Sequence, residues 1–268
     1  MLDLVSDLHI DQWDLTLSNM YPCGEIKHFP FQWKEVDHSN ILVVAGDISD
    51  NIDLSLRYLD EISKYYQKIL FVDGNHEHVQ HYPDLITEEK ILEKVRNLGN
   101  SKLVYLPQQP YIEDGIAFIG ACGWWDYFQK EIEKKDLEYF SSWRPDFTVE
   151  NTKYFIHKVK TTGENQINRM LQLLHKFDVD PDIKQVVIVT HTVPPKNFSE
   201  GRTVVNSLYQ KLFSVTRKLK YWFFGHTHQE LELDDKKDGI KFITNPRGRA
   251  EDFDREVYQV KKISISKL

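Results

Sequence analysis

Five short polar motifs in this chain carry the side chains that bind divalent metal ions. In chain order they read Asp7-Leu8-His9, Gly46-Asp47, Gly74-Asn75-His76-Glu77, Thr190-His191 and Gly225-His226-Thr227-His228. Among them are two aspartates, one asparagine and five histidines. Nitrogen and oxygen donors without cysteine suit first-row transition metals such as Mn, Fe, Zn, Co or Ni. The set is large enough for two ions, so the motifs predict a metal centre.

Most of these motifs stand at the end of a short apolar run. The runs cover residues 1–5, 41–45, 69–72, 186–189 and 221–224. Short β-branched and aromatic runs of this kind predict buried strands of an α/β sheet. Because ligands collect at the carboxyl ends of the strands in open α/β sheets, we expect motifs far apart in the chain to meet at one edge.

The composition sets limits on the class of protein. The chain has 268 residues, of which 41% are hydrophobic and 28% charged, as in ordinary soluble globular proteins. Its formal net charge is −7, from 34 basic and 41 acidic residues. This balance argues against a strong non-specific grip on nucleic acid or on an anionic membrane surface.

The cysteines and the apolar runs predict a cytoplasmic location. Cys23 and Cys122 show neither metal nor redox spacing, and two cysteines make a disulfide framework improbable. No apolar run approaches the ~20 residues of a membrane helix. We expect no secretory signal, since Asp7 lies at the end of the first predicted strand.

Strands and helices alternate in the first hundred residues, which predicts βαβ units. We expect strands near 1–6, 41–46, 69–73, 103–106, 115–121, 186–189, 221–224, 230–233, 240–244 and 256–265. We expect helices over 52–67, 84–98, 164–177 and 204–215 from the spacing of apolar residues. No internal repeat or linker interrupts the chain.

Residues 123–160 differ from the rest, because many aromatic residues alternate there with lysines and an arginine. One interpretation is an aromatic-rich cap, inserted over the edge of the sheet. The other is a peripheral helical pair whose aromatic residues bury its own underside. The sequence leaves both open.

The order of the five motifs resembles the calcineurin-like metallophosphoesterase family over essentially the whole chain. Two later stretches strengthen the resemblance: Thr244-Asn245-Pro246-Arg247-Gly248 is similar to an Asn-Pro-Arg-Gly stretch of small members, and Gly123-Trp124-Trp125-Asp126-Tyr127-Phe128 to one of their aromatic loops. The resemblance implies a single α/β domain over 1–268. It also implies two facing mixed β-sheets flanked by helices, an α/β/β/α sandwich.

The resemblance further implies a role for each motif residue. One ion would be held by Asp7, His9 and His228, and a second by Asn75, His191 and His226. Asp47 would bridge both ions. His76 would be no ligand but would lie over the site as a catalytic residue with Asp47.

The implied reaction is phosphate-ester hydrolysis by in-line attack of a hydroxide that bridges two divalent metal ions. The ions outweigh the charge of Asp7, Asp47 and the hydroxide, which suits an anionic phosphoryl group. A phosphodiester is favoured and a monoester remains open. His76 would stabilise the phosphoryl group or protonate the leaving oxygen, with Glu77 or a neighbour setting its tautomer. Asp50 stands where purple acid phosphatases have a ligand tyrosine, which argues against a ferric–tyrosinate site.

Contacts to the substrate are the least determined part of the site. Arg247 and Arg249 follow a strand near the last motif and could clamp a phosphate, or could form surface ion pairs. His78 could line the cleft or be an ordinary loop histidine. Trp124 is a further candidate for a substrate contact. We expect a small phosphate ester as the partner and no membrane.

Other functions fit the sequence less well. A nuclease acting on short or single-stranded nucleic acid shares the motifs, but the acidic balance and the lack of a basic stripe weigh against it. A non-catalytic scaffold protein of the same fold would be free to lose metal-ligating residues, whereas this chain has all seven that the resemblance implies. The amidohydrolases place His-x-His on their first strand, whereas here His-x-His comes last.

Overall fold

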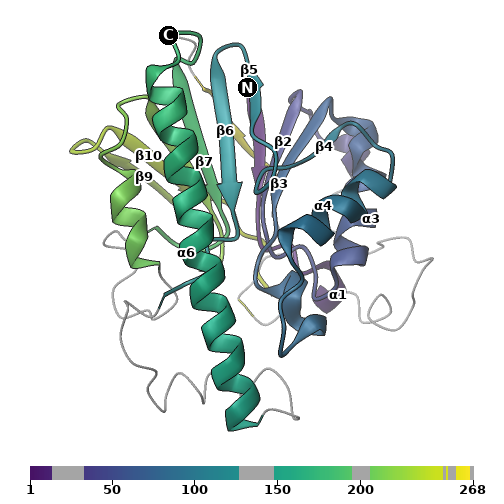
Figure 1. Cartoon of the computed structure of the whole chain (residues 1–268). Helices are drawn as coiled ribbons and strands as arrows, with labels where there is room; N and C mark the ends of the chain where they lie inside the picture. The colour runs from purple at the N-terminus through teal and green to yellow at the C-terminus, as the bar shows by residue number, and fades with distance from the viewer. Residues whose placement is uncertain (14–32, 127–147, 195–205, 250–251, 253–257, 266–268) are drawn as a thin grey trace.

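The computed structural model describes residues 1–13, 33–126, 148–194, 206–249, 252 and 258–265. Two β-sheets face each other in the centre of the fold, and helices cover their outer faces (Figure 1). Cys23 and residues 127–147 of the expected insertion lie outside the described residues.

The first sheet has five strands in the order β11-β1-β2-β3-β4. Strands β1 (Leu2–Val5), β2 (Ile41–Ala45), β3 (Lys68–Val72) and β4 (Leu103–Tyr105) are parallel, and β11 (Lys261–Ile263) runs antiparallel to β1. Their apolar residues alternate in direction, as strand geometry requires. Leu2 and Leu4 face the second sheet, whereas Val5 packs toward the helices.

The second sheet has six strands in the order β5-β6-β7-β8-β10-β9. Strands β6 (Ile116–Ala121), β7 (Gln185–Thr190), β8 (Leu219–Phe224) and β10 (Ile240–Thr244) are parallel; the edge strands β5 (Tyr111–Glu113) and β9 (Leu231–Asp235) are antiparallel to their neighbours. Val187 and Val189 fill the space between the sheets, and Val186 and Ile188 pack toward α6. The expected arrangement of two mixed sheets is therefore confirmed.

Helices form the two outer layers. The first sheet is covered by α3 (Ile52–Ile62) and α4 (Glu88–Asn97), and the second by α6 (Val149–Val179) and the 3-10 helix η6 (Ser207–Leu212). Shorter turns complete the fold: α1 (Ile10–Trp13), η1 (Trp33–Glu35), η2 (Ser63–Tyr65) and η3 (His76–His81). Asn51 starts α3 by accepting hydrogen bonds from the backbone N–H groups of Asp53 and Leu54.

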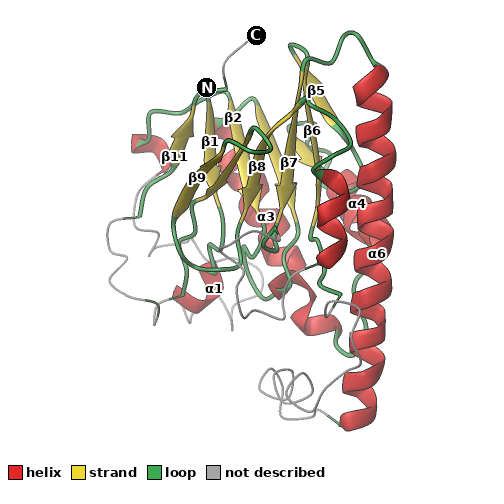
Figure 2. Cartoon of the chain, turned by 90° about the vertical axis from the view of Figure 1, so that its left-hand side faces the viewer, coloured by secondary structure: helices red, strands yellow, loops and turns green. Residues whose placement is uncertain are grey.

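The largest difference from the predicted elements is α6. It spans 31 residues and begins at Val149, fifteen residues before the predicted start at 164, so it includes the end of the predicted insertion. Phe155, Ile156 and Val159 pack there against Trp124 and Trp125. Figure 2 shows α6 extending past the sheets at the end where α1 lies. Among the described residues, no helix is both long and apolar enough to cross a membrane.

The other predicted helices and the last predicted strand are shorter than expected; α3, for example, ends at Ile62 and not at residue 67. The predicted helix over 204–215 is the 3-10 helix η6 among the described residues, and the last strand is confined to Lys261–Ile263. The residues of β11 pair with Leu2, Asp3 and Leu4 of β1.

Candidate metal centre and active site

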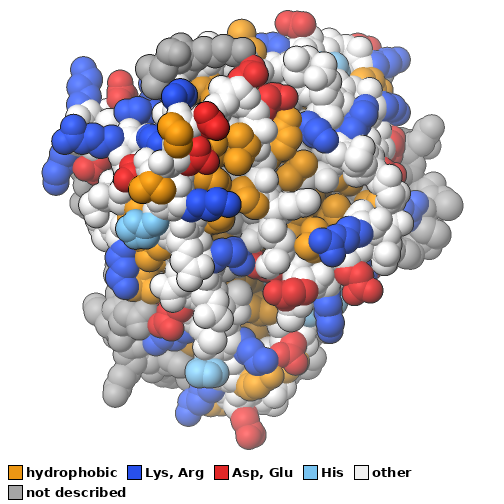
Figure 3. Space-filling view, turned by 45° about the horizontal axis from the view of Figure 1, so that its top comes forward, with side chains coloured by type: hydrophobic (Ala, Val, Ile, Leu, Met, Phe, Trp, Pro, Cys, Tyr) orange, Lys and Arg blue, Asp and Glu red, His pale blue; other side chains and the backbone are white. Residues whose placement is uncertain are grey.

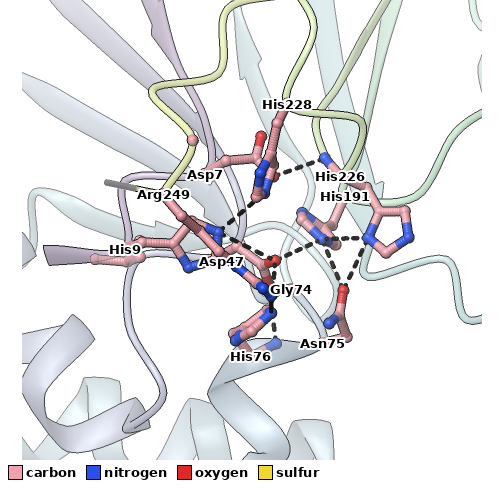
Figure 4. A network of polar contacts seen from close by, with 12 residues as sticks. Asp7, His9, Asp47, Gly74, Asn75, His76, His191, His226, His228 and Arg249 are labelled. Atoms are coloured by element: carbon pink, nitrogen blue, oxygen red, sulfur yellow. Dashed lines mark hydrogen bonds and ion pairs between the residues drawn. The ribbon is translucent and has the colours of Figure 1, made fainter. Parts of the chain in front are cut away.

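The carboxyl ends of five parallel strands bring the polar motifs to one edge of the fold. Strands β1, β2 and β3 come from the first sheet, and β7 and β8 from the second. Backbone hydrogen bonds join the loops that follow them: His9 N–H donates to Asp47 C=O at 3.1 Å, and Gly225 N–H donates to His191 C=O at 2.9 Å. All seven expected ligands and His76 lie together there (Figure 4).

The backbone is strained at most of the expected ligands. Five of the seven have a positive φ: Asp7 (50°), His9 (43°), Asp47 (53°), His226 (71°) and His228 (52°). Asp114 is the one other non-glycine residue with a positive φ in the part of the chain described. Each such residue costs on the order of 1–3 kcal/mol, and strain of this kind gathers at functional sites. The concentration here indicates that the positions of these side chains matter more than their local stability.

One group of three side chains consists of Asp7, His9 and His228, whose ligand atoms all lie within 4.8 Å of one another. His228 Nε2 is 3.1 Å from His9 Nε2 and 3.6 Å from Asp7 Oδ1. Asp7 Oδ2 is buried with no hydrogen-bond partner in the described structure. Burial lowers the pKa of His9 well below its usual range, so its ring is neutral at pH 7 and has a free lone pair.

A second group gathers around Asn75. Its Oδ1 lies 2.9 Å from both His191 Nε2 and His226 Nδ1, and these two nitrogens are 3.2 Å apart. His191 Nδ1 is 3.0 Å from the carbonyl oxygen of Ala45, which orients Nε2 toward the site. Burial, followed by the nearby His191, lowers the pKa of His226 well below its usual range.

Asp47 lies between the two groups. Its Oδ2 is 3.1 Å from His191 Nε2 and 3.9 Å from His9 Nε2. Burial works to raise the pKa of Asp47, but His191 and His76 outweigh it and hold the pKa well below its usual range. The carboxylate is therefore ionised. Gly74 permits its close approach, since a Cβ on Gly74 would stand 2.1 Å from Asp47 Oδ1.

These residues fit divalent cations. In both groups, nitrogen and oxygen lone pairs converge at distances where they would repel one another unless a proton or a metal ion lies between them. A buried carboxylate oxygen without a partner, as at Asp7, is costly for the same reason. The donor set of carboxylate, imidazole and amide matches the transition metals expected from the sequence.

His76 forms a third group of possible ligands with His9 and Asp50 and is held on both ring nitrogens. Its Nδ1 is 2.5 Å from Asp50 Oδ1, and its Nε2 is 2.8 Å from Nη2 of Arg249. Its backbone N–H donates to Asp47 Oδ1 at 2.9 Å. Burial works to lower the pKa of His76, but Asp47 and Asp50 outweigh it and leave the pKa raised. Asp50, which stands where purple acid phosphatases have a ligand tyrosine, is thus the neighbour that orients His76.

The contacts of Glu77 indicate a structural role in the loops and not the expected role of setting the tautomer of His76. Its buried carboxylate accepts hydrogen bonds from the backbone N–H groups of Asp47, Ile48, Ser49 and Gly74 and from the Ser55 hydroxyl. Burial and the nearby Asp47 raise the pKa of Glu77 to about 7. Glu77 therefore clamps the loop after β2 to the loop after β3, and Asp50 contacts His76 instead.

The three suggested substrate contacts are all buried away from solvent. Arg247 is 1% exposed, and its guanidinium lies 4.2 Å from the ring centre of Trp13. His78 directs Nε2 to Asp73 Oδ2 at 2.8 Å, and Trp124 is fully buried in the cluster beneath α6. As substrate contacts, Arg247, His78 and Trp124 stay predictions. Of the two arginines considered, Arg249 is the one that faces the site.

One carboxylate of the site has no counterpart among the residues singled out from the sequence. Asp252 accepts a hydrogen bond from His228 Nδ1 through Oδ2. No motif marks it; the one signal is that it follows the Arg247-Gly248-Arg249 loop closely in the chain.

The chain was compared with known proteins. The family described as calcineurin-like phosphoesterase matches residues 2–230. The uncharacterized protein L509 of Acanthamoeba polyphaga mimivirus is 24% identical over 266 residues, which cover 92% of this chain and 91% of that protein. Phosphopantetheinyl hydrolase (PptH) from Mycobacterium tuberculosis has a similar fold, with a TM-score of 0.62, 16% identity and coverage of 92% of this chain and 89% of its own.

A dimetal phosphatase from Danio rerio is a more distant structural match, with a TM-score of 0.48, 16% identity and coverage of 91% of this chain and 86% of its own. The family match itself covers most of the chain, including every expected metal ligand. It agrees with the order of the motifs and with the two facing sheets. This chain belongs to the calcineurin-like phosphoesterase family, whose members are metal-dependent phosphoesterases.

Proposed function

We propose that this protein hydrolyses phosphate esters with two divalent metal ions held at the edge of its two sheets. The observation that carries the proposal is the position of Asp47, whose Oδ2 lies 3.1 Å from His191 Nε2 and 3.9 Å from His9 Nε2, two nitrogens that belong to different groups of donors. One carboxylate can bridge two ions about 3.5–4 Å apart, as in other two-metal hydrolases.

The geometry supports the following assignment. Asp7, His9 and His228 hold one ion; Asn75, His191 and His226 hold the second; Asp47 contacts both. When bound, the ions supply positive charge for the phosphoryl oxygens and lower the pKa of bound water. The donor set suits Mn, Fe, Zn, Co or Ni.

The residues of the chain that act on the ester itself are His76 and Arg249. Asp50 fixes His76 through Nδ1, so Nε2 faces the site; in the protonated ring, which the raised pKa of His76 favours, Nε2 carries the proton that passes to the leaving oxygen or binds the phosphoryl group. Arg249 directs its guanidinium to the same Nε2 and is placed to bind a phosphoryl oxygen.

Acidic residues around His76 favour a diester over a monoester. Asp50 contacts His76, the backbone N–H of Asp50 donates to Asp11 at 2.9 Å, and Asp252 contacts His228. A phosphodiester carries one negative charge and a monoester close to two at pH 7, so these carboxylates repel the monoester more strongly.

A small ester is favoured over a nucleic-acid strand. On the face seen in Figure 3, lysine and arginine side chains are interspersed with aspartate and glutamate instead of forming a basic stripe. This face lies away from the edge that holds the site; the net charge of −7 gives a polyanion little electrostatic attraction to the chain as a whole.

Hydrolysis of chromogenic esters tests the proposed function. The protein loaded with Mn²⁺ is expected to hydrolyse bis(p-nitrophenyl) phosphate, and p-nitrophenyl phosphate with a lower kcat/KM. Activity should vanish on chelation and return when Mn²⁺ is restored. If the metal-loaded protein hydrolyses neither ester, the proposed function is wrong.

Replacement of Arg249 by alanine is expected to lower kcat/KM for the diester about 10- to 100-fold, mostly through a higher KM. The reason is the loss of a charge-assisted hydrogen bond to the phosphoryl group, worth about 1.5–3 kcal/mol. Steady-state kinetics measure the effect. Arg96→Ala is the matched control, because Arg96 is an exposed arginine near the end of α4. Equal kinetics in the two variants would remove Arg249 from the substrate site.

A further inference from the structure

The carboxylate of Asp252 joins two parts of the site. Its Oδ2 accepts a hydrogen bond from Nδ1 of His228 and another, at 2.8 Å, from the backbone N–H of Arg249. His228 belongs to the group of Asp7 and His9, whereas Arg249 faces His76. One side chain therefore contacts both an expected metal ligand and the segment that carries the expected phosphate contact.

His228 is an expected ligand that needs such support. Its side chain is 17% exposed, whereas the side chains of His9 and His191 are fully buried. Its backbone is also strained, with a φ of 52°. Packing alone thus restrains the His228 ring less than it restrains the two buried rings.

The contact with Asp252 determines which nitrogen of His228 can bind a metal ion. A carboxylate acceptor at Nδ1 keeps the proton on that nitrogen, which leaves the lone pair on Nε2. Nε2 is the atom that lies 3.1 Å from His9 Nε2 and 3.6 Å from Asp7 Oδ1. At His191 the corresponding acceptor is the backbone carbonyl of Ala45, which mutation of a side chain cannot remove.

We propose that Asp252 is a positioning residue that holds His228 in its ligating orientation and so sets the affinity of the Asp7–His9–His228 group for its ion. This inference rests on the proposed two-ion function. Through its bond to the Arg249 backbone, the same carboxylate also anchors the segment that carries the phosphate contact.

Titration of the full-length, metal-free protein with Mn²⁺ in a calorimeter tests the inference without any activity measurement. The wild type should show two binding events. In Asp252→Ala one event should weaken about 10- to 100-fold, the usual cost of losing a carboxylate behind a metal-bound histidine, while the other keeps its affinity. Asp252→Asn, which keeps an acceptor oxygen but not the charge, should lose less affinity than Asp252→Ala.

Asp234→Ala is the matched control, since it removes an exposed aspartate from β9 at the far edge of the second sheet. Circular dichroism and thermal melting follow the fold in every variant. If the wild type binds two ions and Asp252→Ala binds both with unchanged affinity, the role of Asp252 is refuted and the proposed function stands. Equal weakening of both events with a lower Tm would show a merely structural role and would also refute it. A wild type that binds no Mn²⁺ would overturn the proposed function together with this inference.

Discussion

Asp47→Asn is expected to lower kcat/KM for bis(p-nitrophenyl) phosphate by about 10³-fold or more at saturating Mn²⁺. The change keeps the size of the side chain and removes the charge that lies between the two groups of donors. With the sites filled at saturating Mn²⁺, less exact placement of the ions and of the nucleophile costs several kcal/mol of transition-state stabilisation, and each 1.36 kcal/mol is a factor of ten in rate.

The matched control for this variant is Asp3→Asn. Asp3 is as deeply buried as Asp47, but it lies near the start of β1 and accepts hydrogen bonds from Ser39 and Tyr66. Asp3→Asn is expected to lower Tm and to keep kcat/KM within a few-fold of the wild type. A folded Asp47→Asn protein with near-normal turnover would exclude Asp47 as the residue that bridges the ions.

His76→Gln is expected to lower kcat about 10²- to 10⁴-fold while the number of bound Mn²⁺ ions stays the same. The size of the loss is that of a positioned proton donor. We expect the rate to change and the metal content to stay the same because of the contacts of the His76 ring: its Nδ1 faces Asp50 and its Nε2 faces Arg249. Steady-state kinetics and metal analysis on the same samples measure kcat and the number of bound Mn²⁺ ions.

The control for His76→Gln is His78→Gln, two residues further along. His78 is buried, binds Asp73 and packs edge-on against Trp124 at 5.0 Å. Its replacement should reduce stability and leave kcat within a few-fold. If His76→Gln loses an ion, His76 is a ligand and the division of roles is wrong; if its kcat is unchanged, His76 takes no part in the reaction.

The arrangement of the expected ligands could be predicted because it depends on the sheet and not on local detail. Asp7, Asp47, Asn75, His191 and His226 each follow a parallel strand closely, and parallel strands of packed sheets end at one edge. The apolar runs that define those strands are unambiguous, since their residues are buried on both faces.

Substrate contacts could not be predicted in this way, because they depend on the direction of side chains in loops. Arg247 and Arg249 are two residues apart, and the sequence does not distinguish them. In the structure, the backbone N–H of Arg247 donates to Ser6 C=O, and its side chain turns inward over Trp13. Arg249 lies beyond this pairing and reaches His76.

The roles of Glu77 and Asp50 also required the structure. The sequence places Glu77 next to His76, but neighbouring residues in a 3-10 helix point in different directions, and Glu77 turns back to the loop after β2. Asp50 reaches His76 from another loop, 26 residues away. The start of α6 at Val149 also required the structure, because the apolar residues of its first turns pack against Trp124 and Trp125, which come from another segment of the chain.

The central claim is that the edge of the two sheets holds two metal ions that act together on a phosphate ester. The most direct measurement is the rate of bis(p-nitrophenyl) phosphate hydrolysis as Mn²⁺ is added stepwise to the metal-free protein, with bound metal measured in parallel. The rate is predicted to rise with occupancy and to level off at two ions per chain. A rate that levels off at one ion, or no hydrolysis at full occupancy, would contradict the claim.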